Sequence, residues 1–150
     1  MNQNEKGEST KKKKLAIKES DYLKTMDKEF KWKFLQHPDL KAAYAIGLLY
    51  KQVAYQQREQ LKTRGLEKQM RYLFERLDRE NLLKILAECN KVSFKIQSKT
   101  RSKSLGYDQI RSRAEEQLAH FTAEAKEEEL SVAFMFGYDS VLRTWKTNLK

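Results

Sequence analysis

The side chains of this sequence with the clearest capacity for chemistry are lysines and arginines, which gather in three groups along the middle of the chain. Such side chains donate to phosphate oxygens, so a group of them on one surface predicts contact with a nucleic acid backbone. The chain carries 31 basic and 21 acidic side chains, a formal net charge of +10. We therefore expect a nucleic acid partner, with an anionic membrane surface as the weaker alternative. The candidate nucleic-acid-binding residues are Lys51, Arg58, Lys62 and Arg64; Lys91, Lys95, Lys99, Arg101 and Lys103; and Arg111 and Arg113.

One aromatic residue accompanies the first basic group. Lys51, Tyr55, Arg58 and Lys62 are spaced at i, i+4, i+7 and i+11, which places them along one side of a helix. We expect Tyr55 to stack on a base from that stripe, and we expect the tryptophans and phenylalanines in the core. Because the sequence has no zinc-finger motif and no RRM-like pair of strand aromatics, binding should not depend on base sequence.

The sequence offers little for catalysis. His37 and His120 lie far apart, and neither belongs to an HExxH or cysteine-containing metal motif. The common glycine-rich phosphate loops and the nucleophile elbow are missing from the sequence. Glu115 and Glu116 form an acidic pair, but their polar neighbours predict that both are solvated. We expect no enzymatic activity, no metal and no cofactor.

Hydrophobic spacing predicts an all-α protein, a compact bundle of five or six helices. The most apolar segment is a helix over residues 40–62, which Gly65 is expected to terminate. Residues 1–18 include a run of four lysines and are expected to form a flexible basic arm, followed by a single domain over residues 19–150. Apolar residues at helical spacing place the other helices near residues 20–36, 66–77, 79–97, 107–121 and 130–145.

Gly47 and Gly137 stand in the middle of two of these helices, each between large apolar residues. Glycine inside a helix costs about 1 kcal/mol relative to alanine, so such a position indicates the close approach of another backbone. We predict that the two helices pack against each other at these glycines.

The last part of the chain has the opposite charge. Residues 114–150 carry seven acidic and four basic side chains. Because a basic body complements an acidic end, copies of the chain are predicted to associate head to tail. The self-association residues are Glu124, Glu127, Glu128 and Glu129, in an acidic connection that precedes the last helix.

The number of cysteines and the length of the longest apolar run indicate the cellular location of the protein. Cys89 is the only cysteine and falls on an apolar helix face, which fits a reducing cytoplasm. The longest apolar run, residues 42–50, is far shorter than the roughly 20 residues that span a bilayer. We expect a cytoplasmic protein without a membrane-spanning segment or signal peptide.

Three blocks of the sequence follow one another in a recognisable order. They read AAYAIGLLYKQVAYQQREQ, then YLFERLDRENLLKILAECNKVSFKIQS, then EELSVAFMFGYDSVL, which contains an FxxGY-like motif. Together, over about residues 39–146, they resemble the small subunit of type I CRISPR effector complexes (Cascade). The similar form is the C-terminal domain of the large subunit in subtypes I-B and I-D.

The resemblance implies a noncatalytic helical bundle, several copies of which lie beside the guide-bearing backbone subunits and the large subunit of the complex. Such a subunit helps to assemble the complex and to hold the guide RNA–target DNA duplex and the displaced strand. Because R-loop formation is a near-balanced exchange of duplexes, modest backbone contacts can tip it. The alternative is a purely structural scaffolding subunit whose positive charge meets acidic protein surfaces rather than nucleic acid.

Overall fold

The computed structural model describes residues 19–73, 77–100 and 105–148. These residues form six α-helices and two short helical turns, with no strand among them, which confirms the all-α bundle. The expected arm of residues 1–18 lies outside the described residues, as do Arg101 and Lys103. In chain order the elements are α2 (Glu19–Glu29), the 3₁₀ turn η1 (Lys33–Leu35), α3 (Pro38–Gln56), the π-helical turn η2 (Gln57–Leu61), α4 (Gly65–Leu73), α5 (Arg79–Thr100), α6 (Leu105–Ala119) and α7 (Glu127–Asn148).

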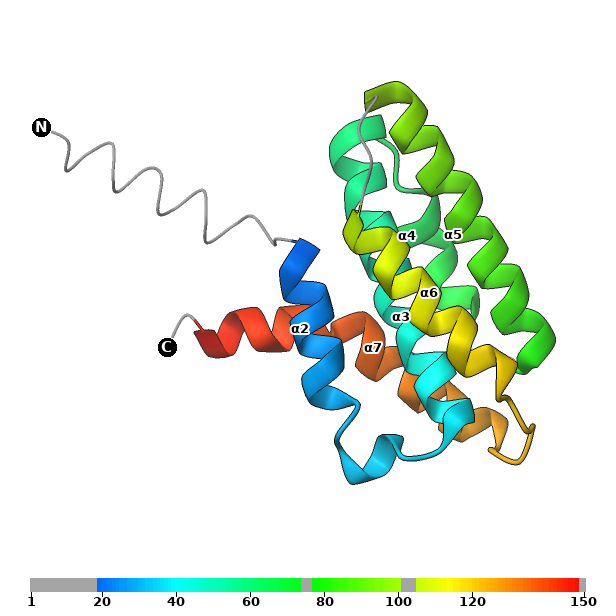
Figure 1. Cartoon of the computed structure of the whole chain (residues 1–150). Helices are drawn as coiled ribbons and strands as arrows, with labels where there is room; N and C mark the ends of the chain where they lie inside the picture. Colours follow the sequence, from blue (N-terminus) through cyan, green and yellow to red (C-terminus); the bar gives the residue numbers. More distant parts are fainter. Residues whose placement is uncertain (1–18, 74–76, 101–104, 149–150) are drawn as a thin grey trace, which may run out of the picture.

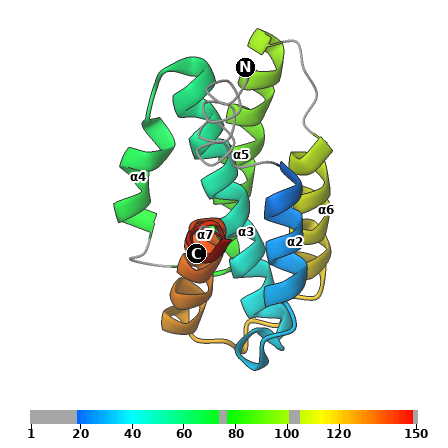
Figure 2. The same ribbon diagram turned by 90° about the vertical axis from the view of Figure 1, so that its left-hand side faces the viewer.

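Helix α3 lies at the centre of the bundle and the other helices surround it (Figures 1 and 2). Of its 19 residues, 14 are buried. A helix buried on every side requires packing partners all round. Helices α5, α6 and α7 each pack against α3, and α2 contacts both α6 and α7. Helix α7 crosses α3 obliquely (Figure 1).

Helices α3 and α7 cross at Gly47 and Gly137, which confirms the predicted contact. A Cβ atom added to Gly47 would lie 2.9 Å from the carbonyl carbon of Phe134 and closer still to its oxygen. A Cβ atom on Gly137 would lie 2.8 Å from the carbonyl carbon of Tyr44. Real Cβ atoms do not approach a backbone so closely, so glycine at both positions is what permits the crossing.

We predict that Gly47→Ala destabilises the protein, although alanine is the better helix former. The expected loss is about 1–3 kcal/mol of unfolding free energy, because the two backbones must separate. Gly65→Ala is the matched control, since a Cβ atom there would meet only the side-chain amide of Gln57, at 3.6 Å. Urea denaturation measures both variants, and equal midpoints would contradict the tight crossing.

The start of α3 is bonded to the connection between α6 and α7. His37 caps the helix, with its Nδ1 accepting from the N–H of Asp39 at 3.1 Å. The buried Asp39 carboxylate accepts from the N–H and the hydroxyl of Thr122, at 2.7 and 3.0 Å, and from the N–H of Ala125 at 3.2 Å. One carboxylate therefore joins two segments more than 80 residues apart in the sequence.

The surroundings of Asp39 lower its pKa. Burial is the largest single influence and acts to raise the pKa, but the donors from Thr122 and Ala125, together with the nearby His37, outweigh it. Because the pKa is lower in the folded than in the unfolded chain, the carboxylate stabilises the fold above about pH 4. That contribution is lost as the pH falls through the folded-state pKa.

Asp39→Asn is expected to lower the unfolding free energy by about 2 kcal/mol at pH 7, because the charge-assisted hydrogen bonds are lost. The difference from the wild type should shrink as the pH falls below about 4, because the carboxylate is protonated first in the unfolded chain and, at lower pH, in the folded protein. Denaturation curves between pH 7 and pH 3 provide the test. Glu116→Gln is the control, since this carboxylate is exposed and outside the ion pairs of the described residues, and its loss should cost less than about 1 kcal/mol. A pH-independent difference between Asp39→Asn and the wild type would contradict this role.

Three element boundaries differ from those predicted from the sequence. The first helix ends at Glu29 rather than near residue 36, and η1 follows it. Gly65 does not terminate the central helix, because Lys62 takes the left-handed conformation with φ of 57° and Gly65 begins α4. The segment Glu127–Glu129 forms the first turn of α7 rather than part of the acidic connection.

Side-chain hydrogen bonds explain the early turn after α3. The Gln57 Oε1 accepts from the N–H of Leu66 at 3.0 Å, and the Tyr50 hydroxyl donates to the carbonyl of Leu66 at 2.5 Å. Both backbone groups of Leu66 are thus bonded to the α3–η2 segment. The prediction that Gly65 ends the central helix used only neighbouring residues, so it did not include these longer-range hydrogen bonds.

Candidate nucleic-acid interface

Helix α5 carries a row of lysines on its exposed side, which we call the lysine row: Lys91, Lys95 and Lys99. Four-residue spacing places them about 6 Å apart along one side of the helix. All three side chains are exposed, and no carboxylate of the described residues forms an ion pair with them. The buried side of α5 is made by Leu82, Ile85, Leu86, Cys89, Val92, Ser93 and Ile96.

Two features of α5 differ from the sequence prediction. The helix continues to Thr100 rather than ending near residue 97, and the Thr100 hydroxyl donates to the carbonyl of Ile96 at 2.9 Å, so Lys99 belongs to the helix. Phe94 is 71% exposed between Lys91 and Lys95, although phenylalanines were expected in the core. Its position off the apolar stripe of α5 was the sequence signal that could have identified it.

Two more cations of the predicted site lie near the same end of the bundle. Lys62 and Arg64 are exposed in the segment after η2, and η2 packs against α5. The C-terminal ends of α3 and α5 point to the same end of the molecule in both views (Figures 1 and 2). The structure therefore brings Lys62 and Arg64 to the end of the bundle where the lysine row finishes.

Lys51 has a structural role instead. Its Nζ lies 4.2 Å from the centre of the Tyr138 ring, and the side chain is half-buried. Burial lowers the pKa of this ammonium group, while the carboxylates of Asp139 and Glu67 act in the opposite direction. Lys51 thus joins α3 to α7 beside the glycine crossing and lies outside the candidate interface.

The side chains of Tyr55 and Arg58 pack against each other. The Arg58 guanidinium lies 5.4 Å from the centre of the Tyr55 ring, and its Nη1 pairs with Glu67 Oε1 at 3.2 Å. The predicted stripe through Lys51 and Lys62 is also broken, because the π-helical turn changes the register and Lys62 lies beyond the helix. Arg58, in η2, therefore joins Tyr55 of α3 to Glu67 of α4.

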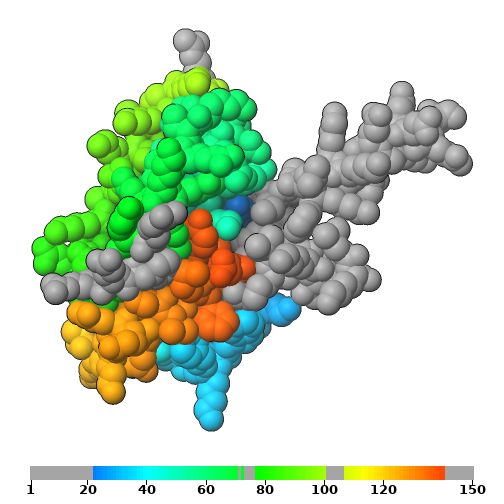
Figure 3. All heavy atoms as spheres, turned by 180° about the vertical axis from the view of Figure 1, so that it is seen from behind, coloured from blue at the N-terminus to red at the C-terminus, as the bar shows by residue number. Residues whose placement is uncertain are grey.

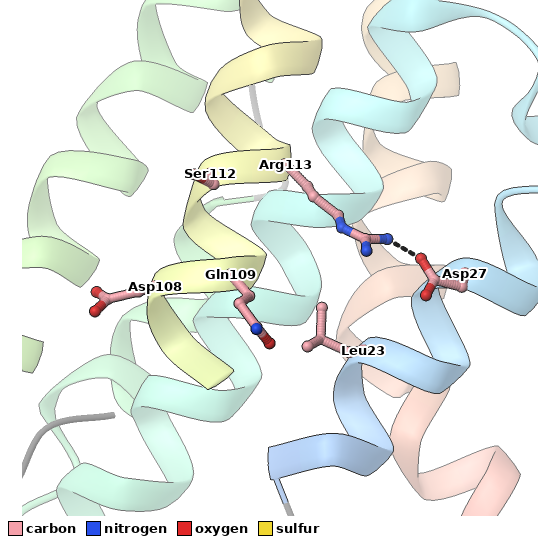
Figure 4. A pocket seen from close by; sticks show the side chains of 6 residues that line it. All are labelled: Leu23, Asp27, Asp108, Gln109, Ser112 and Arg113. Atoms are coloured by element: carbon pink, nitrogen blue, oxygen red, sulfur yellow. Dashed lines mark ion pairs between the residues drawn. The ribbon is translucent and has the colours of Figure 1, made fainter. Parts of the chain in front are cut away.

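The third basic group is paired with acids. Arg111 lies 3.7 Å from Asp108 and 3.4 Å from Glu115, both on its own helix. Arg113 reaches from α6 to an ion pair with Asp27 on α2 (Figure 4). This pair borders an open depression of about 500 Å³, lined by Leu23, Asp27, Asp108, Gln109, Ser112 and Arg113. Arg113 therefore links α6 to α2, Arg111 pairs within α6, and neither is available as a bare phosphate contact.

The four glutamates predicted for self-association have different surroundings. Glu124 Oε2 lies 3.3 Å from His37 Nε2, which is the donor because Nδ1 accepts from Asp39. The Glu129 carboxylate accepts from the N–H of Lys126 at 3.0 Å and so caps α7. Glu127 and Glu128 are exposed at the start of α7, where the helix dipole favours negative charge.

The remaining candidates for chemistry are few. Among the described residues, no group of three or more His, Cys, Asp and Glu side chains is arranged to hold a metal ion. Cys89 is fully buried, and burial raises the pKa of its thiol. In the same part of the chain, each helix is too short or too polar to cross a membrane.

A scan against protein-family models and searches of curated proteins and solved structures gave no match. The functional assignment therefore rests on the arrangement of side chains and on the sequence resemblance. Of the predicted interface, the lysine row with Lys62 and Arg64 is the part that is both exposed and free of acidic partners within the described residues.

Proposed function

We propose that this chain is a noncatalytic small subunit of a type I CRISPR RNA-guided surveillance complex. It stabilises the guide RNA–target DNA R-loop and the displaced strand through contacts with phosphate groups that do not depend on sequence. The observation that carries the proposal is the lysine row, three exposed cations at regular spacing with no acidic partner among the described residues. Lys62 and Arg64 extend the positive surface at the same end.

The physical chemistry of the proposed task suits such a surface. Guide pairing carries the sequence information, and formation of the R-loop is close to balanced in free energy. A few phosphate contacts can therefore shift the equilibrium without reading a base. Lysines present compact charges on flexible side chains, which tolerate variation in strand geometry.

The proposed partners are the backbone and large subunits of the complex, guide RNA, target DNA and further copies of the chain, all in the cytoplasm. Exposed Glu127 and Glu128 lie at the start of α7, while the lysine row finishes at the other end of the bundle (Figures 1 and 2). This separation of charge supports head-to-tail association.

Reversal of the lysine row to glutamate is expected to weaken binding of single-stranded DNA at least about tenfold, since each lost phosphate contact also removes counterion release. The control reverses three other exposed lysines, Lys24, Lys68 and Lys126, and so changes the net charge equally. Fluorescence anisotropy with a labelled oligonucleotide measures both. Equal losses in the two variants would show that net charge, rather than the row, drives binding.

Membership of a guide RNA complex has its own test. A tagged copy of the full chain, purified from its host, should bring down the other effector subunits and a CRISPR guide RNA. A complex of proteins without RNA would instead favour the scaffolding function.

Head-to-tail association predicts that reversing Glu127 and Glu128 to lysine reduces self-association at low salt. Glu129→Gln is a poor control because Glu129 caps α7, so Glu59 and Glu116, which are exposed and outside the ion pairs of the described residues, are reversed instead. Sedimentation velocity over a range of protein concentrations reports the size of the assembly. A size distribution unchanged by the Glu127 and Glu128 reversal would rule the contact out.

A further inference from the structure

The segment between α2 and α3 presents two aromatic rings at the surface. Residues 31–34 read Lys-Trp-Lys-Phe, so cations and rings alternate. Trp32 is 36% exposed and Phe34 is 39% exposed, which corrects the sequence prediction that both belong to the core. We call Lys31, Trp32, Lys33 and Phe34 the aromatic–lysine platform.

The platform is held in one conformation by contacts from both sides. The side-chain amide of Gln36 donates to the carbonyls of Phe30 and Trp32, at 3.0 and 2.8 Å, and closes the turn around η1. On α7, the Phe136 ring lies against both rings, with centroid distances of 5.9 Å to Trp32 and 5.6 Å to Phe34. Rings that are already ordered lose little conformational freedom on binding a ligand.

Figure 3 shows the light-blue atoms of this segment beside the orange atoms of α7 on one outer face of the molecule. The two views of the ribbon place the α2–α3 connection at the end of the bundle opposite the C-terminus of α5 (Figures 1 and 2). The platform is therefore separate from the lysine row.

The outer surface of this segment is cationic. Lys28, Lys31 and Lys33 are exposed. The acids of residues 28–41 are Glu29 and Asp39, and both are buried. Glu29 accepts from the Tyr44 hydroxyl at 2.5 Å, and Asp39 accepts from Thr122 and Ala125. Both carboxylates are therefore bonded inside the fold, while the exposed acids Asp27 and Glu124 pair with Arg113 and His37.

We propose that the aromatic–lysine platform binds unpaired nucleotides of a single strand. Trp32 and Phe34 stack on bases, and Lys31 and Lys33 contact the adjacent phosphates. Rings combined with a positive surface are the means by which proteins hold single strands without reading sequence. A protein partner is the competing occupant, but lysines beside the rings are unfavourable in the dry centre of a protein interface. The platform goes beyond the proposed function, since it recognises bases rather than backbone.

The test compares two probes of equal length, a fluorescent oligothymidylate and an abasic strand with the same phosphates. Wild-type protein is expected to bind the strand that carries bases more tightly. Trp32→Ala should weaken that binding about tenfold and leave the abasic strand almost unaffected, while Trp32→Phe, which keeps a ring, should retain most of the affinity. Leu83→Ala is the control, since Leu83 is 38% exposed on α5 and this variant should keep the wild-type affinity for both strands.

Trp32→Leu separates stacking from an apolar protein-docking surface. Stacking predicts that Trp32→Leu behaves like Trp32→Ala, whereas wild-type affinity in Trp32→Leu, or equal loss on both probes in Trp32→Ala, would overturn the proposal. Replacing the three lysines of the lysine row with glutamate should lower the affinity for both probes by the same factor. If charge reversal of the lysine row left DNA binding unchanged but Trp32→Ala weakened it, the proposed base stacking by the platform would be supported. Only the proposed phosphate binding by the lysine row would then be wrong. Circular dichroism at the assay temperature confirms that each variant is folded.

Discussion

The backbone contact between α3 and α7 at Gly47 and Gly137 is the constraint on which the rest of this structure depends. It allows the two helices to approach until a Cβ atom at either glycine would meet the opposite backbone. Close approach lets Lys51 reach the Tyr138 ring from α3 and places Phe136 of α7 under the aromatic–lysine platform. With one side of α3 covered by α7, α5 and α6 pack on the remaining sides, so the lysine row faces outward. The core and both proposed binding surfaces therefore depend on the same contact between α3 and α7.

Net charge alone gives an incomplete picture of the surface. The arginines Arg58, Arg111 and Arg113 all pair with acids, two of them with acids on another helix. A planar guanidinium with several donors suits such fixed pairing, whereas the compact ammonium group of lysine gains less from it. The cations left to meet a partner at the α5 surface are lysines with Arg64. A sum over the sequence cannot make this distinction.

The sequence was most informative where a pattern is local, or where a residue type is unfavourable in its position unless a contact requires it. Helical periodicity correctly predicted the α-helices, and Gly47 and Gly137 disclosed the crossing because glycine in a helix is unfavourable without such a reason. It failed where the decisive contact is distant in the sequence. Asp27 lies 86 positions from Arg113, and the bonds that link Leu66 to Gln57 and Tyr50 create the turn that breaks the predicted stripe. The exposure of Trp32 depends on how η1 lies against α7, which the composition of the segment does not specify.

The central claim is that the lysine row binds phosphate groups of a nucleic acid strand. Its most direct test is the slope of log affinity against log salt for single-stranded DNA, measured with the wild-type chain and with the variant in which the row is neutralised to glutamine. Each phosphate contact with a single strand contributes about −0.7 to that slope. Three contacts therefore predict that the variant slope is shallower by about 2. Parallel lines for the two proteins would contradict the account.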